Sequence, residues 1–235
     1  MPLDTKHNSV LGGNRAMQDV YSKAKLAFHS AALQSIRSGE QQPPIVVHWF
    51  PTNVCNQACV FCTFGSGPDR LRAKILNRRK ERWKNQQLAD PHAVMPKEKM
   101  LETVHCLKEI GVKAIQISGG GEPVAYPFFD EMVSAITAAG MEFGLVTNGT
   151  LINHVKAELI GSLGFVWARV SIDAGNQGDY KRVRNVSAGH WSRAWKSVSL
   201  LARERVRAGH HPEASVGVGY VVDRDNWGVM LKLCS

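Results

Sequence analysis

Three of the five cysteines in the 235-residue chain lie close together, as Cys55, Cys59 and Cys62 in the sequence CNQACVFC. Thiolate ligands select soft metals, either zinc or the irons of iron–sulfur clusters. A structural zinc site needs four ligands, often two separated pairs of cysteines. His48 and His92 could supply a fourth ligand, but neither has a finger-like spacing to the cysteines. Three thiolates on an iron–sulfur cube would instead leave one iron open to a substrate or cofactor, whereas an electron carrier normally uses four cysteines.

A regular alternation of strands and helices surrounds these cysteines. The apolar runs and glycine stops predict strands at 45–50, 112–118, 141–146, 166–172 and 215–222, separated by helices at 97–110, 128–139, 152–163 and about 190–208. This alternation is typical of βαβ units in a parallel sheet with right-handed crossovers. The cysteines occupy the loop at the C-terminal end of the first strand. Cys106, in the first of these helices, is predicted to be a core residue.

Five parallel strands curl toward a barrel but do not complete one. A full (β/α)₈ barrel takes ~250 residues, and fewer remain after the linker that ends at residue 44. We therefore predict an α/β fold, a partial (β/α) barrel at 45–235, preceded by an N-terminal extension at 1–44 with a helix at 14–38 and a proline linker. The start of another helix near 225–227, with the sequence ending at Ser235, indicates a barrel truncated at its C-terminus.

Three further motifs follow the predicted strands in order. They are GGGEP at 119–123 after the second strand, VTNGT at 146–150 closing the third, and SIDA at 171–174 in the fourth. Together with the cysteine motif Cys-x₃-Cys-x-aromatic-Cys, they resemble the radical S-adenosylmethionine (SAM) superfamily over about residues 45–225. A single glycine-rich or Asn-Gly turn is common, but four motifs in register on successive strands are specific.

This resemblance implies two cofactors, a [4Fe–4S] cluster and SAM. Cys55, Cys59 and Cys62 would hold three irons, and the fourth would be chelated by the amino and carboxylate groups of SAM. The other residues that the resemblance places at SAM are Phe61 beside the adenine, Gly119, Gly120 and Gly121 where the backbone approaches the methionine part, Glu122, Asn148, Ser171, Asp173 and Arg184. Arg182 is an equal candidate for the position of Arg184, near the SAM carboxylate.

The fourth predicted strand places its polar residues on one side. Arg169, Ser171 and Asp173 alternate with apolar residues, so they share a face of the strand. Helices cover the outer side of a parallel barrel, so this polar side should line the lumen. Gly217 and Gly219 share one face of the last strand and leave room in the lumen, for adenosine or for close packing.

The resemblance implies an enzyme that cleaves SAM to a 5′-deoxyadenosyl radical, which abstracts a hydrogen from an unidentified substrate, with a peptide as one candidate. An external flavodoxin- or ferredoxin-like donor would supply the electron. Two alternatives remain open at this point: a non-catalytic iron–sulfur or zinc-binding scaffold, and a nucleic-acid-modifying protein that uses the basic segment 70–84. That segment also fits a solvated surface helix, and it holds a single aromatic residue where a nucleic-acid surface would interleave more.

The charge and the hydropathy of the chain bear on its partners and its location. The net charge of +9, from 29 basic and 20 acidic residues, raises the question of anionic partners without naming one. No apolar stretch approaches the ~18 residues of a membrane span, and the polar first residues do not form a signal peptide. We therefore predict a cytoplasmic chain without a membrane partner.

Overall fold

The computed structural model describes residues 29–62, 64, 90, 92–209, 214–222 and 226–230. The chain divides into two compact units, Met1–Pro44 and Ile45–Ser235. The described helix of the first unit is α2, Ser30–Arg37. It is the C-terminal part of the helix predicted at 14–38, whose earlier residues lie outside the described part. The basic segment 70–84 lies outside it as well.

A sheet of five parallel strands forms the framework of the second unit. The strands are consecutive neighbours, in the order β1-β2-β3-β4-β5. Their bounds are β1 Val46–Trp49, β2 Ala114–Ile117, β3 Glu142–Thr147, β4 Trp167–Ser171 and β5 Ser215–Gly219. The predicted five-stranded parallel sheet is confirmed. Four of the predicted strands are two or three residues too long, because apolar residues continue into the loops beyond the paired backbone, and the third has the right length but is shifted by one residue.

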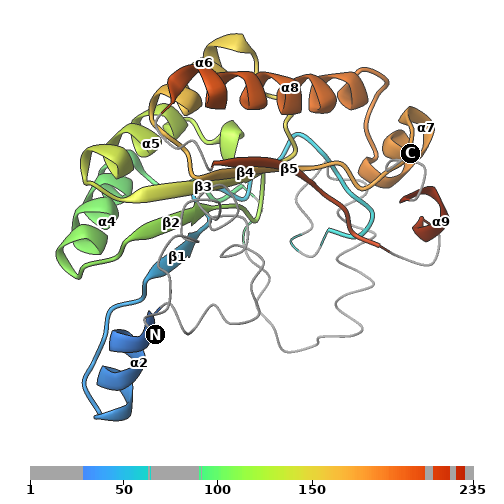
Figure 1. Cartoon of the computed structure of the whole chain (residues 1–235). Helices are drawn as coiled ribbons and strands as arrows, with labels where there is room; N and C mark the ends of the chain where they lie inside the picture. Colours follow the sequence, from blue (N-terminus) through green and yellow to red (C-terminus); the bar gives the residue numbers. More distant parts are fainter. Residues whose placement is uncertain are drawn as a thin grey trace, which may run out of the picture. The chain divides into compact units, whose positions relative to one another are not determined.

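Four helices cover one face of this sheet (Figure 1). Their bounds are α4 Lys97–Glu109, α5 Phe129–Ala138, α6 His154–Ser162 and α8 His190–Ala208. Apolar residues of these helices pack on the outward side chains of the strands in one core, which includes Met100, Met132, Ile160, Leu201, Ile115, Phe143, Leu145 and Val170. The four helices were predicted, and each of them buries apolar residues against the sheet.

The prediction that Cys106 is a core residue is wrong, since its side chain is exposed on α4. This helix buries Met100 and Val104, which lie four residues apart on one face. A residue two positions after Val104 is turned by roughly 200° around the helix axis, so Cys106 points away from the sheet. The apolar neighbours in the sequence concealed which side of the helix is buried.

Three short elements complete the described chain. They are the 3₁₀ helix η2 at Pro123–Ala125, α7 at Gln177–Arg184 and α9 at Trp227–Met230. Only α9 was anticipated, as the start of a helix near 225–227. The sequence of α7 is too polar to show an apolar stripe. It is capped instead by Asn176, whose side chain accepts from the Asp179 N–H. None of the helices in these described ranges is long and apolar enough to cross a bilayer.

Candidate functional site

A cavity of about 520 Å³ opens at the C-terminal ends of the strands. All three clustered cysteines line it, together with the glycine-rich loop after β2, the end of β3, two residues of β4 and the last residue of α7. Of the predicted site residues, the ones that line it are Cys55, Cys59, Phe61, Cys62, Gly119, Gly120, Gly121, Glu122, Asn148, Ser171 and Arg184. Asp173 is not in the cavity wall, although it contacts Arg184 directly behind it.

The cysteine loop is held in place by the C-terminal end of α7. The Ala58 N–H donates to the Arg184 carbonyl at 3.2 Å, and the Val60 N–H donates to the Val183 carbonyl at 2.9 Å. Within the loop, the Cys62 N–H donates to the Cys59 carbonyl at 3.0 Å. These bonds use helix-end carbonyls that have no partner inside the helix, so α7 fixes the backbone on both sides of Cys59.

Arg184 joins the cysteine loop to the end of β4. It is buried, and its guanidinium forms an ion pair with Asp173 and donates to the Ser171 carbonyl at 2.6 Å. Its other terminal nitrogen donates to the Cys59 sulfur and to the Gln57 side-chain oxygen, each at 3.3 Å. The remaining nitrogen, Nε, is buried without a partner among the described residues.

Arg182 occupies a different environment from Arg184. It is exposed on α7 and pairs with Asp179 one turn earlier in the helix, at 3.1 Å. The two arginines are two residues apart, so they point to different sides of the helix. Of the two candidates for a cationic site residue, the structure therefore places Arg184 in the cavity and Arg182 on the surface.

Asp173 is a buried residue just after β4 that contacts both the end of α7 and the segment beyond β5. It has a left-handed backbone conformation, with φ of 54°. One carboxylate oxygen pairs with Arg184, and the other accepts from the Val221 N–H beyond β5 at 2.5 Å. Burial raises its pKa, and the charge of Arg184 opposes that rise. Asp173 therefore holds Arg184 in position.

The glycine-rich loop packs directly on the cysteine loop. The Gly121 N–H donates to the Thr52 carbonyl at 3.0 Å, and the Glu122 N–H donates to the Val54 carbonyl at 2.9 Å. A Cβ on Gly121 would lie 2.1 Å from the Val54 carbonyl oxygen. A Cβ on Gly120 would lie 2.0 Å from the side-chain oxygen of Asn53. The contact between the two loops therefore requires Gly121 to lack a side chain, because the clash there is with backbone, whereas at Gly120 it is with a side chain. The sequence did not reveal this reason for Gly121.

Glu122 organises the end of β3. Its side chain is 2% exposed. One carboxylate oxygen accepts from the Thr147 hydroxyl at 2.5 Å and the Val124 N–H at 3.2 Å, and the other accepts from the Asn148 N–H at 2.7 Å. Burial raises its pKa, and these hydrogen bonds act in the opposite direction. Its oxygens are therefore engaged within the protein.

A network of amide and hydroxyl groups ties β3 to the cysteine loop. The Asn148 side chain donates to the side-chain oxygen of Asn56 at 2.8 Å and accepts from the Thr150 hydroxyl at 2.7 Å. Asn56 in turn donates to the Thr150 hydroxyl at 2.9 Å. Asn56 and Thr150 were not predicted as site residues, although each lies inside a motif that was quoted.

Two aromatic rings contact Arg184 at the cavity wall. Phe61 lines the cavity, and the Arg184 guanidinium lies 5.6 Å from the centre of its ring. On the other side of Arg184, the Tyr180 ring is 5.8 Å away, and its hydroxyl accepts from Gln57 at 3.1 Å. This cation–π arrangement confines the guanidinium. Gln57 and Tyr180 are functional positions that sequence reasoning missed, because the helix that carries Tyr180 was not predicted.

The three thiols line one cavity without converging on a single ion position in the described structure. Within the described ranges, which include all three cysteines of the motif, no group of three His, Cys, Asp or Glu side chains is arranged around one ion position. A zinc site would need its sulfurs about 2.3 Å from one ion, whereas the cysteines of a cluster ligate separate irons. Burial, with a smaller contribution from Glu122, raises the pKa of Cys55 to about 12. A bound cationic cluster would offset that cost.

Comparisons with known proteins agree with this geometry. The family model of the radical SAM superfamily matches residues 49–227. The S-adenosylmethionine-dependent nucleotide dehydratase of Thermoplasmatales archaeon (strain ISO4-H5) is 34% identical over 108 residues, which is 46% of this chain and 38% of that protein. Mycofactocin maturase MftC of Mycobacterium ulcerans (strain Agy99) is 28% identical over 185 residues, 79% of this chain and 42% of the maturase.

Solved structures show the same fold. SuiB of Streptococcus suis, bound to its precursor peptide SuiA, matches with a TM-score of 0.61 at 15% identity, over 88% of this chain and 39% of SuiB. The predicted partial barrel of the radical SAM type is therefore confirmed. The chain spans about two fifths of the length of these proteins. Its curated relatives are enzymes, a dehydratase and a maturase, and membership implies SAM and an iron–sulfur cluster as cofactors. The chain belongs to the radical SAM superfamily.

Proposed function

We propose that this chain is the catalytic core of a radical SAM enzyme whose active site is the cavity at the C-terminal rim of the sheet. The observation that carries the proposal is the meeting of all three cysteines with the three other motif loops around one cavity. When bound there, a [4Fe–4S] cluster would supply the electron that cleaves SAM to methionine and a 5′-deoxyadenosyl radical, which takes a hydrogen atom from the substrate. The protein binds, orients and shields these groups.

Each group of residues at the cavity has its own proposed role. Cys55, Cys59 and Cys62 are the proposed iron ligands. Arg184, whose buried Nε has no partner among the described residues, is the proposed partner of an anionic group such as the SAM carboxylate. Phe61 forms an apolar wall. Asn148 contributes to the polar rim. Glu122 and Asp173 hold their neighbours in position, since their oxygens are already engaged within the protein.

The electron donor and the substrate are further parts of the proposal. We propose an external flavodoxin- or ferredoxin-like donor, because each reductive cleavage takes one electron from the cluster and that electron must be replaced. A peptide is the proposed substrate, supported by the fold shared with SuiB, which was solved with its precursor peptide SuiA. The relationship to a nucleotide dehydratase supports a nucleotide as the competing candidate.

A turnover assay tests this function. The chain is reconstituted anaerobically with iron and sulfide, reduced with dithionite and incubated with SAM, and 5′-deoxyadenosine is quantified by chromatography. We expect slow formation of 5′-deoxyadenosine even without substrate. The Cys59→Ala variant should form none, and the matched Cys106→Ala variant, which changes an exposed thiol outside the cavity, should keep the parent rate. Equal turnover by Cys59→Ala and the parent would contradict the proposal.

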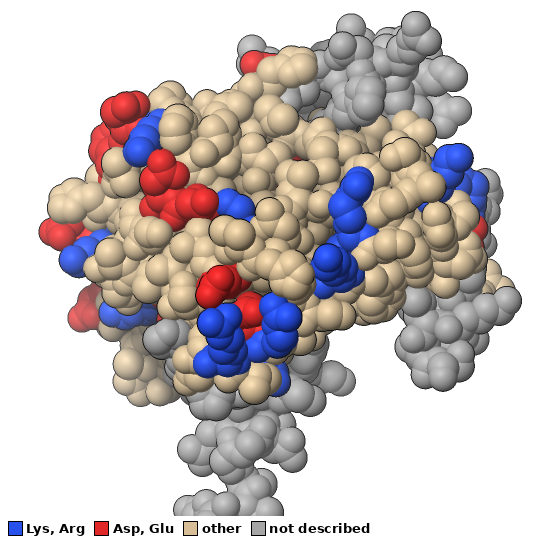
Figure 2. All heavy atoms as spheres, turned by 90° about the horizontal axis from the view of Figure 1, so that it is seen from above, with Lys and Arg blue, Asp and Glu red and all other residues tan. Residues whose placement is uncertain are grey.

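The helix-covered face gives no support to the nucleic-acid alternative, whose basic segment 70–84 lies outside the described residues. Figure 2 shows acidic and basic side chains interspersed over the helix-covered face. Several of them form ion pairs there, among them Lys156 with Asp130 and Arg207 with Glu158. A phosphate-binding surface would instead gather unpaired positive charge.

A further inference from the structure

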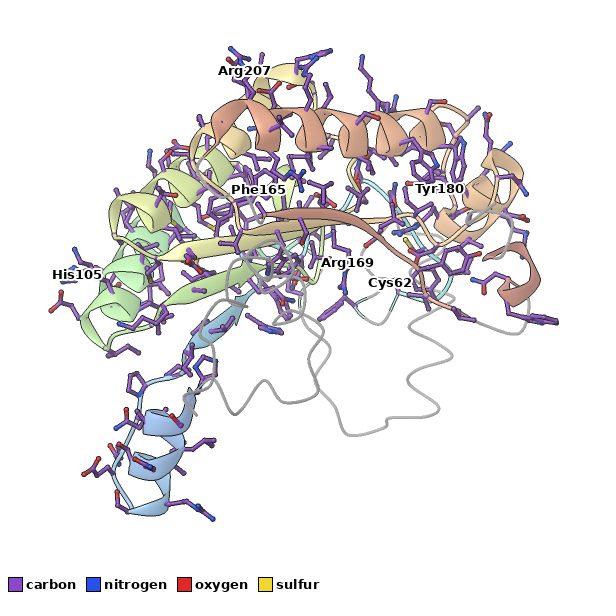
Figure 3. The ribbon with its side chains drawn as sticks, viewed as in Figure 1. Cys62, His105, Phe165, Arg169, Tyr180 and Arg207 are labelled. Atoms are coloured by element: carbon purple, nitrogen blue, oxygen red, sulfur yellow. The ribbon has the colours of Figure 1, made fainter. Side chains whose placement is uncertain are left out.

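One positive charge in the cavity, that of Arg169, has no role in the function proposed so far. Arg169 lies in the middle of β4 between two buried residues, Ala168 and Val170, and its own side chain is exposed. Figure 3 shows it on the side of the sheet opposite Phe165 and the helices, toward the side on which Cys62 lies. Arg169 lines the same cavity as the three clustered cysteines.

The Arg169 side chain forms no hydrogen bond or ion pair with any residue in the described ranges, although its backbone pairs with the neighbouring strands. Burial raises the pKa of Asp173, and the positive charge of Arg169 acts to lower it. Both oxygens of that carboxylate nevertheless have other partners, one Arg184 and the other the Val221 N–H. Glu122, the acidic residue of the cavity wall, is 2% exposed and accepts three internal hydrogen bonds. A cation without a counter-ion on a cavity wall is available to an anionic ligand.

Two glycines of β5 direct the Arg169 side chain toward the cavity. Arg169 is in register with Gly217, where a Cβ would meet nothing within 4 Å. Two residues closer to the C-terminal rim, a Cβ on Gly219 would lie 3.2 Å from the Arg169 Cδ and 3.3 Å from its Cγ and Nε. The Arg169 side chain therefore runs along β5 toward the rim, over Gly219. A Cβ at position 219 would make the Arg169 side chain shift by a few tenths of an ångström, and a larger side chain there would occupy its path.

We propose that Arg169 is the residue that binds an oxyanion of the substrate, a carboxylate or a phosphate. The inference rests on the proposed function, in which Arg184 is the cation assigned to the one carboxylate of SAM. The charge of Arg169 then remains for a second anion in the same cavity. A guanidinium suits this task because it binds either oxyanion through two parallel hydrogen bonds. The two sources are a nucleotide phosphate and an acidic group of a peptide.

Isothermal titration calorimetry with two probes tests the proposal. Inorganic pyrophosphate represents the phosphate source and glutarate the carboxylate source. Each is titrated into the full chain, anaerobically reconstituted and saturated with SAM, and into the chain without added iron or SAM. We expect one probe to bind at one site per chain. The Arg169→Gln variant should bind it at least about tenfold more weakly, as expected for the loss of a charged hydrogen-bond partner.

Two further variants separate position from charge. Gly219→Leu keeps the charge of Arg169 but fills the path of its side chain, so it should also weaken probe binding. Arg182→Gln removes the same charge from the surface of α7, outside the cavity, and should bind the probe as the parent does. The affinity for SAM should be the same in Arg169→Gln as in the parent. Stronger binding of pyrophosphate would identify the nucleotide source, and stronger binding of glutarate the acidic peptide.

Three results would overturn the proposal. The first is that neither probe binds saturably to the parent, and the second is that Arg169→Gln binds the probe as tightly as the parent. The third is a loss of SAM affinity in Arg169→Gln as large as its loss of probe affinity, which would assign Arg169 to SAM itself. Arg169-dependent probe binding in a chain that forms no 5′-deoxyadenosine would support the anion site while refuting the proposed function.

Discussion

The contact between the glycine-rich loop and the cysteine loop yields the most quantitative prediction, for Gly121→Ala. The new Cβ would lie 2.1 Å from the Val54 carbonyl oxygen and 2.5 Å from two backbone carbons of Asn53 and Val54. Backbone atoms cannot rotate away as a flexible side chain can, so the loops must separate. Overpacking of this kind costs about 1–3 kcal/mol. The hydrogen bonds of Gly121 and Glu122 to the cysteine loop would weaken as well, at about 1 kcal/mol each.

The expected loss for Gly121→Ala is therefore about 3–5 kcal/mol, a large part of the ~5–15 kcal/mol that stabilises a typical domain. Urea denaturation followed by circular dichroism measures it as a lower midpoint with an unchanged m-value. Gly217→Ala is the matched control, because nothing lies within 4 Å of its Cβ position, and it should change stability by less than about 0.5 kcal/mol. A loss below about 1 kcal/mol in Gly121→Ala would refute the view that the glycine serves loop packing.

Two further predictions concern the buried charges around the cavity. Arg184→Met leaves the Asp173 carboxylate buried without its ion-pair partner and should cost about 3–5 kcal/mol by urea denaturation. The double variant with Asp173→Asn should recover part of that loss, and a strictly additive cycle would show that the pair is not coupled. Burial raises the pKa of Glu122, so folding favours its protonated form. The contribution of Glu122 to the free energy of unfolding is therefore complete below about pH 4.5, and it is lost as the pH rises through the folded-state pKa. The free energy of unfolding should therefore fall less steeply with rising pH in Glu122→Gln than in the parent, and identical slopes would contradict the assigned direction.

The sequence predicted the sheet and the loops of the cavity because both depend on local patterns. Apolar runs and glycine stops mark the strands, and the motifs lie directly after them. Parallel strands bring their C-terminal ends to one rim, so the order of the motifs along the chain is enough to place the cysteines beside the loop at 119–123.

The remaining features depend on contacts between distant segments. The polar helix α7 has no apolar periodicity, so its docking on the cysteine loop and the contacts of Tyr180 with Gln57 could not be predicted. The glycine-rich loop was interpreted as a surface for SAM, whereas its spacing to Val54 shows that the fold itself already requires Gly121. Asp173 was placed at the cofactor by the family resemblance. In the structure it is absent from the cavity wall and pairs with Arg184 of that wall, at a turn with a positive φ that the sequence did not indicate.

Anaerobic reconstitution with metal and sulfide analysis tests the central claim most directly, since it asks whether the cysteine cavity holds a cluster. The account predicts about four irons and four sulfides per chain with broad absorption near ~400 nm. This cluster should be absent from Cys55→Ala, Cys59→Ala and Cys62→Ala and unchanged in Cys106→Ala. One zinc per chain with no iron, or a full cluster in any of the three cavity variants, would contradict it.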